Sequence, residues 1–309
     1  MTNNKLIDLA IIGGGVAGLT AGLYGTRAGL ETILFEEIYP GGQTAAIEKL
    51  ENYPGFIDGI EGMTLTSNIY KQATNSGLET MYNKIIEIKK INNELQLILD
   101  NNSIVNTKSI IIATGANPKK LHLPLEEKLT GRGVHYCATC DGAFYKDKIV
   151  MINGGGNTAL TDSLILSNFA KKVYLVHRRE EFRGDEILVN KVKNNNKIEI
   201  IYNNTIKELI GDDKLSSVIL VNKNNNELQT ITVDGLFVAI GVSPNSALAK
   251  GILKLSDKNE IITDRNLQTS IKGVFAAGDV RDTNLRQVIT AAADGAIATS
   301  MASHYIKTL

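Results

Sequence analysis

Apolar and polar positions follow the same order in two places along the chain. In each place an apolar run leads into a glycine-rich turn, a stretch with helical spacing follows, and a second short apolar run comes next. Short apolar runs bounded by glycine are typical of buried strands, whereas apolar positions three and four residues apart are typical of helices. The pattern predicts helices at 16–28 and 158–169. It predicts strands at 5–12, 31–35, 148–153 and 172–176.

The similarity between the two halves continues downstream. Each half has a hairpin pattern around an Asn-containing turn, and then an apolar strand that ends in glycine, at Gly115 and Gly241. Asn tolerates the left-handed backbone of tight turns, so these positions favour hairpins. The hairpins are predicted at 95–99 with 104–107, and at 217–222 with 228–233. The chain therefore indicates two modules of one design.

A proline-containing segment follows each of these strands, where the chain would cross between modules. Pro118 and Pro244 disfavour helix in the residue before them. After the second crossing come a strand-and-turn pattern at 273–280 and an apolar helix at 286–306. If this tail packs with the first module, the second module is an insertion within the first. The predicted domains are 1–115 with 246–309, and 116–245.

Both glycine-rich turns have the spacing of a dinucleotide-binding fingerprint. The first turn holds Gly13, Gly15 and Gly18, and the second holds Gly154, Gly156 and, in third place, Ala159. The first glycine makes the tight turn, the second lets a pyrophosphate approach the backbone, and the third lets helix and strand pack closely. The helix N-terminus then presents unpaired N–H groups to the phosphates. The alternative is a pair of glycine-rich turns in an unrelated α/β protein.

The residue that ends the second strand of each module indicates which nucleotide fits. Glu36 follows Gly13 at the spacing at which His177 follows Gly154. An acid at this place binds ribose hydroxyls, whereas basic residues accommodate a 2′-phosphate. The first module therefore suits FAD or NAD. The second suits NADP, because guanidinium groups bind phosphate in bidentate fashion. Its basic cluster consists of His177, Arg178, Arg179 and Arg183; the alternative is a solvated face whose charges pair with nearby acids.

Composition excludes several classes of protein. The 33 Lys and Arg balance 33 Asp and Glu, which argues against a nucleic-acid-binding surface. With 43% hydrophobic and 21% charged residues, the 309-residue chain can bury cores for two domains. No stretch is long enough for a membrane span, and the N-terminus lacks a signal-peptide pattern. We therefore expect a cytoplasmic protein.

The only two cysteines form one C-x-x-C, Cys137 and Cys140, followed by Asp141. Such a pair can be a redox disulfide, half of a zinc site, or two buried thiols. Zinc needs about four ligands, and only His122 and His135 are available to complete such a site. A redox pair fits a chain that already carries two nucleotide sites. Asp141 is either a helix cap or a proton donor beside a thiolate.

Taken together, these motifs resemble bacterial-type, low-molecular-weight thioredoxin reductase. The matching segments are 13–18, 40–43, 51–55, 113–115, 137–145, 154–159, 177–183, 273–280 and 286–287. The resemblance extends over nearly the whole chain and implies an α/β fold with two Rossmann-like dinucleotide-binding domains of the three-layer ββα type, the second inserted in the first. It also implies a homodimer, with FAD on the discontinuous domain and NADPH on the inserted domain that carries the cysteines.

The same resemblance implies the site residues. FAD would bind at Gly13, Gly15, Gly18, Glu36, Gly42, Gln43, Asn52, Asp279, Arg286 and Gln287. NADPH would bind at Gly154, Gly156, Asn157, Thr158, His177, Arg178, Arg179 and Arg183. Cys140 would be the flavin-side thiol, Cys137 would attack the disulfide of thioredoxin, and Asp141 would be the acid–base group. The chain departs from the family at Asn153 and at Thr161-Asp162, where two acids are common.

The expected function is thus reduction of thioredoxin by NADPH through FAD and the Cys137–Cys140 disulfide. One alternative is a reductase of another protein disulfide, in a glutaredoxin-like or peroxiredoxin-system partner. The other is a nucleotide-binding redox sensor without catalysis. Turnover of NADPH with the partner discriminates between the enzyme and the sensor.

Overall fold

The computed structural model describes residues 6–47, 49–91 and 94–309, and its chain divides into two compact units. Unit 1 comprises Met1–Asn117 with Ser243–Leu309, and unit 2 comprises Pro118–Val242. The chain passes between them at two short strands, β7 (Ala116–Pro118) and β16 (Val242–Pro244), which pair with each other. The two proline-containing segments of the sequence are therefore extended strands.

Unit 1 is built on a seven-stranded sheet with the order β3-β2-β1-β6-β5-β4, in which β17 also pairs with β6. The strands are β1 (Leu6–Ile12), β2 (Thr32–Phe35), β3 (Glu79–Met81), β4 (Ile85–Ile91), β5 (Glu94–Leu99), β6 (Ile104–Ile112) and β17 (Val274–Ala276). The hairpin β4–β5 is antiparallel and joins β6 in antiparallel pairing, while the other strands run parallel. The central strands are apolar on both faces, because both faces are covered.

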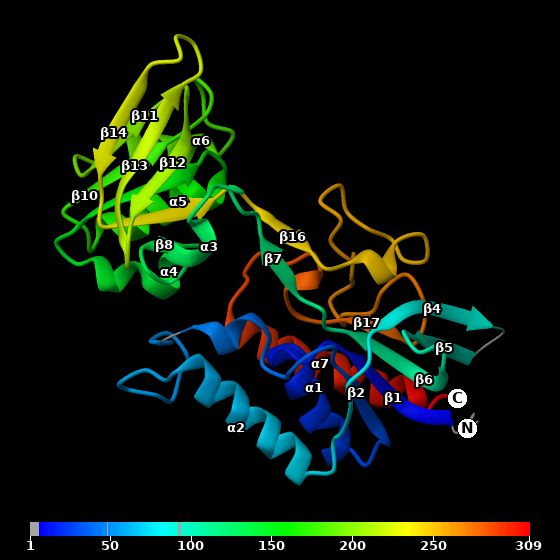
Figure 1. The fold of residues 1–309 in the computed structure, drawn as a ribbon. Coiled ribbons are helices and arrows are strands. Elements are labelled where there is room, and N and C mark those ends of the chain that lie inside the picture. The colour runs from blue at the N-terminus through cyan, green and yellow to red at the C-terminus, as the bar shows by residue number, and fades with distance from the viewer. Residues whose placement is uncertain (1–5, 48, 92–93) are drawn as a thin grey trace. The chain divides into compact units, whose positions relative to one another are not determined.

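Three helices cover one face of this sheet: α1 (Val16–Arg27), α2 (Gly62–Asn75) and α7 (Val288–Ile306) (Figure 1). The helices α1 and α7 approach closely, since a Cβ on Gly295 would lie 2.2 Å from the carbonyl oxygen of Ala17. The Thr299 hydroxyl also donates to the carbonyl of Ala21 at 3.1 Å. This contact ties the C-terminal helix to the helix that follows the first glycine turn.

Unit 2 has three layers (Figure 1). Its central five-stranded parallel sheet has the order β11-β10-β9-β15-β8. These strands are β8 (Val134–His135), β9 (Ile149–Gly154), β10 (Lys172–Val176), β11 (Ile198–Ile201) and β15 (Gly235–Ala239). One apolar cluster packs the sheet against an antiparallel layer of β12 (Asn204–Gly211), β13 (Leu215–Asn222) and β14 (Leu228–Thr232). A second cluster packs it against α5 (Asn157–Ser167) and α6 (Glu186–Lys193).

Short helices complete the two units. Unit 1 has the 3-10 turns η1 (Gly42–Ala46), η3 (Ala247–Ala249) and η4 (Gly278–Val280), and unit 2 has α3 (Glu126–Leu129), α4 (Ala138–Asp141) and η2 (Gly142–Tyr145). The predicted helix at 286–306 begins only at Val288, because the side chains of Gln287 and Thr290 form a capping box there. The predicted helix at 158–169 begins one residue earlier than predicted, at Asn157, and ends two residues sooner, at Ser167. Lys5, the first residue of a predicted strand, lies outside the described residues.

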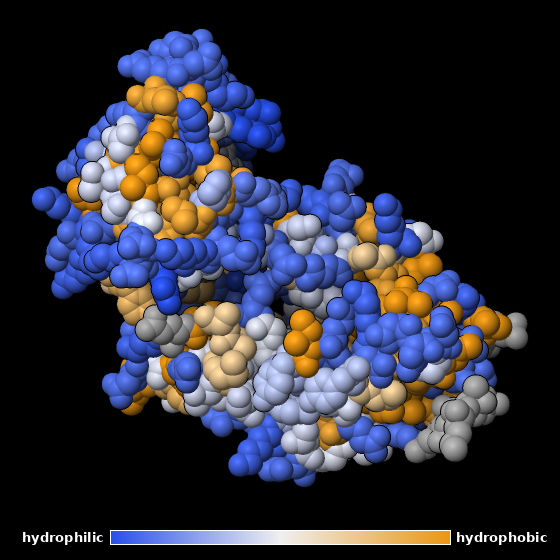
Figure 2. Space-filling view, in the orientation of Figure 1, coloured by the Kyte–Doolittle hydropathy of each residue, from blue (hydrophilic) through white to orange (hydrophobic). Residues whose placement is uncertain are grey.

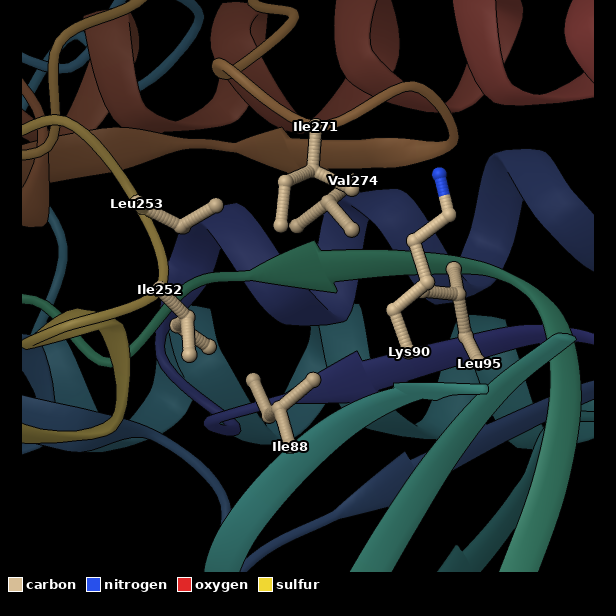
Figure 3. Close-up of a pocket in the computed structure, with 7 residues that line it drawn as sticks. All are labelled: Ile88, Lys90, Leu95, Ile252, Leu253, Ile271 and Val274. Carbon is tan, nitrogen blue, oxygen red and sulfur yellow. The ribbon is translucent and has the colours of Figure 1, made fainter. Parts of the chain in front are cut away.

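Hydrophilic side chains cover much of the face seen in Figure 2, with apolar residues gathered in separate patches. Among the described residues, no helix is long and apolar enough to span a membrane. Unit 1 also contains a cavity between the β4–β5 hairpin and the segment before β17 (Figure 3). Its lining is apolar apart from the Lys90 ammonium, so it lacks the converging polar groups of a binding site. The lining residues are Ile88, Lys90, Leu95, Ile252, Leu253, Ile271 and Val274.

Candidate dinucleotide sites and redox disulfide

The first glycine turn is shaped by contacts that only glycine permits. Gly13 has a φ of 102°, and a Cβ there would lie 2.6 Å from the carbonyl oxygen of Ala113. A Cβ on Gly18 would lie 1.9 Å from the carbonyl oxygen of Gly13. Gly15 differs, because a Cβ there would meet no atom within 4 Å. Packing within the protein therefore does not require Gly15, and the open space before α1 fits a phosphate group.

Glu36 lies beside this turn, directly after β2. One carboxylate oxygen accepts a hydrogen bond from the Gly14 N–H at 2.7 Å, and the other accepts from Ile38 at 3.1 Å. The Gly41 N–H donates to the Gly14 carbonyl at 2.7 Å, which holds the loop before η1 against the turn. This loop and Glu36 together border the turn, as a site for an adenosine with free ribose hydroxyls requires.

Two other predicted FAD residues meet although they are far apart in sequence. The Asn52 side-chain amide donates to the Gln287 side-chain oxygen at 3.0 Å. The Gln43 amide donates to the Ala116 carbonyl and, at 3.1 Å, to the side chain of Asn117. Gly42 has a φ of 57° and lies next to Gly15. Unit 1 thus brings Asn52 to Gln287 at the N-terminus of α7, and Gly42 to Gly15 before α1.

A buried ionic network, which sequence reasoning missed, holds the turn that carries Asp279. Asp294 on α7 accepts two hydrogen bonds from the Arg281 guanidinium, at 2.7 and 2.9 Å, and a third from the Gly278 N–H at 2.9 Å. Asp294 is only 7% exposed. Its signal in the sequence was weak: it is the single acid in an alanine-rich helix. A bidentate pair at this burial fixes η4 rigidly.

Asp279 and Arg286 lie close enough to this network for their charges to interact with it. Burial raises the pKa of Asp279, and the Arg286 guanidinium opposes that shift while Asp294 adds to it. Arg286 donates to Glu260 at 2.7 Å, yet its Nε is buried with no hydrogen-bond partner among the described residues. Buried donors are normally paired. The unpaired Nε beside a desolvated carboxyl fits a site whose bound group supplies the missing polar contact.

The second glycine turn repeats the first. A Cβ on Gly154 would lie 2.4 Å from the Ala239 carbonyl oxygen, whereas one on Gly156 would meet nothing within 4 Å. Open space again lies before a helix, here α5, so this turn also fits a pyrophosphate. The Asn157 side chain is already hydrogen-bonded to Asp185. Its amide donates to the Asp185 carboxylate at 2.9 Å, and its oxygen accepts from the Asp185 N–H at 2.7 Å. Thr158, beside it, is exposed.

The predicted basic cluster divides into one buried ring and three exposed guanidiniums. His177 is 6% exposed, and its Nε2 lies 3.0 Å from the Glu181 carbonyl oxygen. Burial lowers the pKa of His177, so the ring is neutral near pH 7 and packs beneath the turn at Gly155. Arg178, Arg179 and Arg183 are exposed and form no ion pair with any residue that the structure describes. These three side chains are therefore available for a phosphate.

Cys137 and Cys140 form a disulfide at the start of α4, with their Cα atoms 5.3 Å apart. Ala138 between them is buried in the cluster that includes α5, so the disulfide is anchored to unit 2. The Cys140 N–H points at the Cys137 sulfur at 3.2 Å. Asp141 follows, partly exposed, and its carboxylate lies 3.1 Å from Nδ1 of His135. Within the described ranges, no three His, Cys, Asp or Glu side chains converge as a metal site would require.

The burial of Asp162, on α5, is expected to make the stability of the protein depend on pH. Burial raises the pKa of its carboxyl to about 7. The folded state therefore holds a proton that the unfolded state releases near pH 4, so stability falls as pH rises from about 4 to 7. We expect Asp162→Asn to stabilise the protein at pH 8 by about 1–3 kcal/mol, as the partly exposed carboxyl no longer needs to ionise. Urea unfolding at pH 8 measures this gain.

The gain of Asp162→Asn should disappear at pH 4, where the native carboxyl keeps its proton. Asp213→Asn is the matched control, since Asp213 is an exposed aspartate of the same unit. Equal stability of Asp162→Asn and the unmutated protein at pH 8 would contradict the assignment of a buried, costly carboxylate.

Comparison with known proteins places this arrangement in a family. The sequence model described as pyridine nucleotide-disulphide oxidoreductase matches residues 7–295. The thioredoxin reductase of Peptoclostridium acidaminophilum is 41% identical, and the alignment covers 98% of each chain. That of Bacillus subtilis is 38% identical, over 100% of this chain and 98% of the relative.

Solved structures agree. The crystal structure of thioredoxin reductase from Streptococcus pyogenes superposes with a TM-score of 0.92 at 37% identity, covering 99% of this chain and all of that one. The thioredoxin reductase from Giardia duodenalis gives a TM-score of 0.91 at 35% identity, covering 98% and 99%. These likenesses confirm the predicted fold class of two Rossmann-like domains. The chain belongs to the pyridine nucleotide-disulphide oxidoreductase family.

Proposed function

We propose that this protein is an NADPH-dependent thioredoxin-disulfide reductase that uses FAD. The observation that carries the proposal is the Cys137–Cys140 disulfide within a unit that also bears a glycine turn before a helix and three exposed arginines. When bound, FAD takes two electrons from NADPH and delivers them to a disulfide. The relatives at about 40% identity over the full chain support the same activity.

Unit 1 would hold FAD and unit 2 would hold NADPH. In unit 1 the pyrophosphate would lie in the open space before Gly15, and Glu36 would bind the ribose hydroxyls. Asp279 and Arg286 would contact the remainder of the cofactor, and this assignment is supported by the Arg286 Nε, which is buried without a hydrogen-bond partner among the described residues. In unit 2 the turn at Gly156 would bind the pyrophosphate, and Arg178, Arg179 and Arg183 would bind the 2′-phosphate. His177 would support the turn from below.

Reduction of thioredoxin would then proceed by thiol–disulfide exchange with Cys137 and Cys140. Two electrons and two protons convert the disulfide into two thiols. The Cys137 thiol releases its proton, and the thiolate attacks the disulfide of thioredoxin, which forms a mixed disulfide and releases one thioredoxin sulfur as a thiolate. The Cys140 thiol then releases its proton, and its thiolate attacks the Cys137 sulfur, restores the internal disulfide and releases the second sulfur; the two thioredoxin thiolates take up two protons. Asp141, adjacent to Cys140, would hold the proton that a departing thiolate takes up.

The proposal also includes the oligomeric state of the protein and its location in the cell. We expect a homodimer, which sedimentation of the purified protein tests. We also expect a cytoplasmic protein, since a reductase that regenerates thiols belongs in a reducing compartment.

One experiment tests the activity. The purified protein should show the visible spectrum of bound flavin, bleach on addition of NADPH, and consume NADPH continuously only when thioredoxin is present. Turnover with a glutaredoxin or a peroxiredoxin but not with thioredoxin would assign another protein disulfide as the substrate. Bleaching without turnover on any protein disulfide would overturn the reductase and favour a redox sensor.

A further inference from the structure

A chain of three polar side chains lies beside the redox disulfide in unit 2. His135 ends β8, Asp141 follows Cys140 at the end of α4, and Tyr145 ends η2. The Nδ1 atom of His135 lies 3.1 Å from the Asp141 carboxylate, and its Nε2 lies 2.6 Å from the Tyr145 hydroxyl. Both ring nitrogens are therefore engaged, and one of them contacts the acid next to the cysteines.

Packing fixes the orientation of the imidazole. His135 is 9% exposed and Tyr145 is 7% exposed. The His135 ring stacks on Phe237 of β15, with the ring centroids 5.2 Å apart, and meets the Tyr145 ring nearly at right angles. A ring held on two sides cannot flip without disturbing the core. The position of Nδ1 beside the Asp141 carboxylate is thus set by the fold rather than by the two side chains alone.

The neighbouring groups determine the direction of the hydrogen bonds. Burial, with the nearby Asp141 and Asp234 carboxylates, keeps the pKa of Tyr145 far above its ordinary value, so the phenol stays protonated and donates. Because the Tyr145 hydroxyl donates to Nε2 of His135, the ring proton lies on Nδ1, from which it is donated to Asp141. Asp234 itself accepts from the Ile149 N–H, and the Lys148 ammonium lies 5.4 Å from the centroid of the Tyr145 ring.

We propose that His135 is a positioning residue for the disulfide-exchange step, holding the Asp141 carboxylate beside Cys140. This inference rests on the proposed reductase function. When Asp141 transfers its proton to a departing thiolate, an S–H bond forms and a carboxylate remains. The Nδ1–H of His135 donates to that carboxylate and lowers its energy, because hydrogen bonds to ionised groups are the stronger ones. Solvent returns the proton to Asp141.

Three substitutions separate the two hydrogen bonds of the imidazole. His135→Ala removes both, and Tyr145→Phe removes only the bond at Nε2. His135→Asn keeps an amide donor near the place of Nδ1 and therefore retains the bond to Asp141. His304→Asn is the matched control, since His304 is exposed on α7 in unit 1. Tyr145→Phe also preserves the ring packing, so it tests the chain of hydrogen bonds even if His135→Ala folds poorly.

We expect His135→Ala to lower kcat with thioredoxin about tenfold and to move the pH profile of kcat about one unit toward higher pH, since one pH unit is a tenfold factor. The KM for NADPH and the rate at which NADPH bleaches the flavin should stay within twofold of the unmutated values. His135→Asn should recover most of the lost kcat, and Tyr145→Phe should fall between the two. A merely structural role would not shift the pH profile or be rescued by Asn.

A second readout does not depend on turnover. Nitrogen-15 NMR of labelled histidine should show His135 with its proton on Nδ1, identified as the signal that His135→Asn lacks. An Nε2-protonated ring, or an unchanged kcat and pH profile in His135→Ala, would overturn the inference. If the unmutated protein does not turn over thioredoxin at all, the proposed function fails instead, while the NMR result still tests the contact with Asp141.

Discussion

Replacing either Cys137 or Cys140 by serine is expected to abolish thioredoxin reduction, with a loss of at least about a thousandfold in kcat. Serine cannot form the disulfide, and an alcohol is far too weak an acid to act as the exchanging nucleophile. Flavin binding and bleaching by NADPH should persist in both variants, because that half-reaction needs no thiol. The visible spectrum and the rate of NADPH-driven bleaching measure the retained step, and thioredoxin-dependent NADPH oxidation measures the lost one.

The matched control is Thr139→Ser, which changes an exposed residue inside the same motif and leaves both sulfurs in place. It should turn over thioredoxin at nearly the unmutated rate. The cysteines would not be the relay if either Cys→Ser variant still reduced thioredoxin near that rate. Tight, stoichiometric zinc in the unmutated protein, lost in the same variants, would instead support a metal site at the C-x-x-C.

The second large effect concerns the coenzyme. Arg178→Gln with Arg179→Gln should raise the KM for NADPH about a hundredfold and leave the KM for NADH little changed. Both guanidiniums are exposed and lack ion pairs among the described residues, so they are available to the 2′-phosphate that NADH lacks. A charge-assisted hydrogen bond contributes about 1.5–3 kcal/mol, and two of the weakest give about 3 kcal/mol, which is roughly a hundredfold. Steady-state kinetics with both coenzymes provides the measurement.

Arg265→Gln serves as the control, because Arg265 is an exposed arginine of unit 1 without an ion pair in the described part of the chain. It should leave both KM values unchanged. Equal use of NADPH and NADH by the unmutated protein would contradict the assignment. A uniform rise in KM for both coenzymes in the double variant would show that the arginines bind the part that the two coenzymes share.

Local patterns were sufficient for the framework of the fold. The strand predicted at 172–176 is β10 to the residue, and the helix predicted at 16–28 is α1 with one residue fewer. The helix is bounded by Gly15 and Gly29, and the strand is a short run rich in β-branched and aromatic residues, so local sequence alone restricts the backbone in both segments. The two glycine turns could also be predicted from the sequence. The close approaches at Gly13 and Gly154 leave no room for a side chain, so these positions require glycine. The individual cofactor contacts remain predictions.

The sequence by itself determined the repeated strand–turn–helix units, the cysteine pair and the exchange of an acid for a basic cluster, because each depends on residues close together along the chain. Only the tertiary structure decided which distant groups meet. Asp294 reaches the Gly278 turn, Asn52 meets Gln287, and His135 turns from a candidate zinc ligand into the partner of Asp141. These contacts depend on how helices and strands pack, and a carboxylate or imidazole looks the same in sequence whether it faces water or a buried partner.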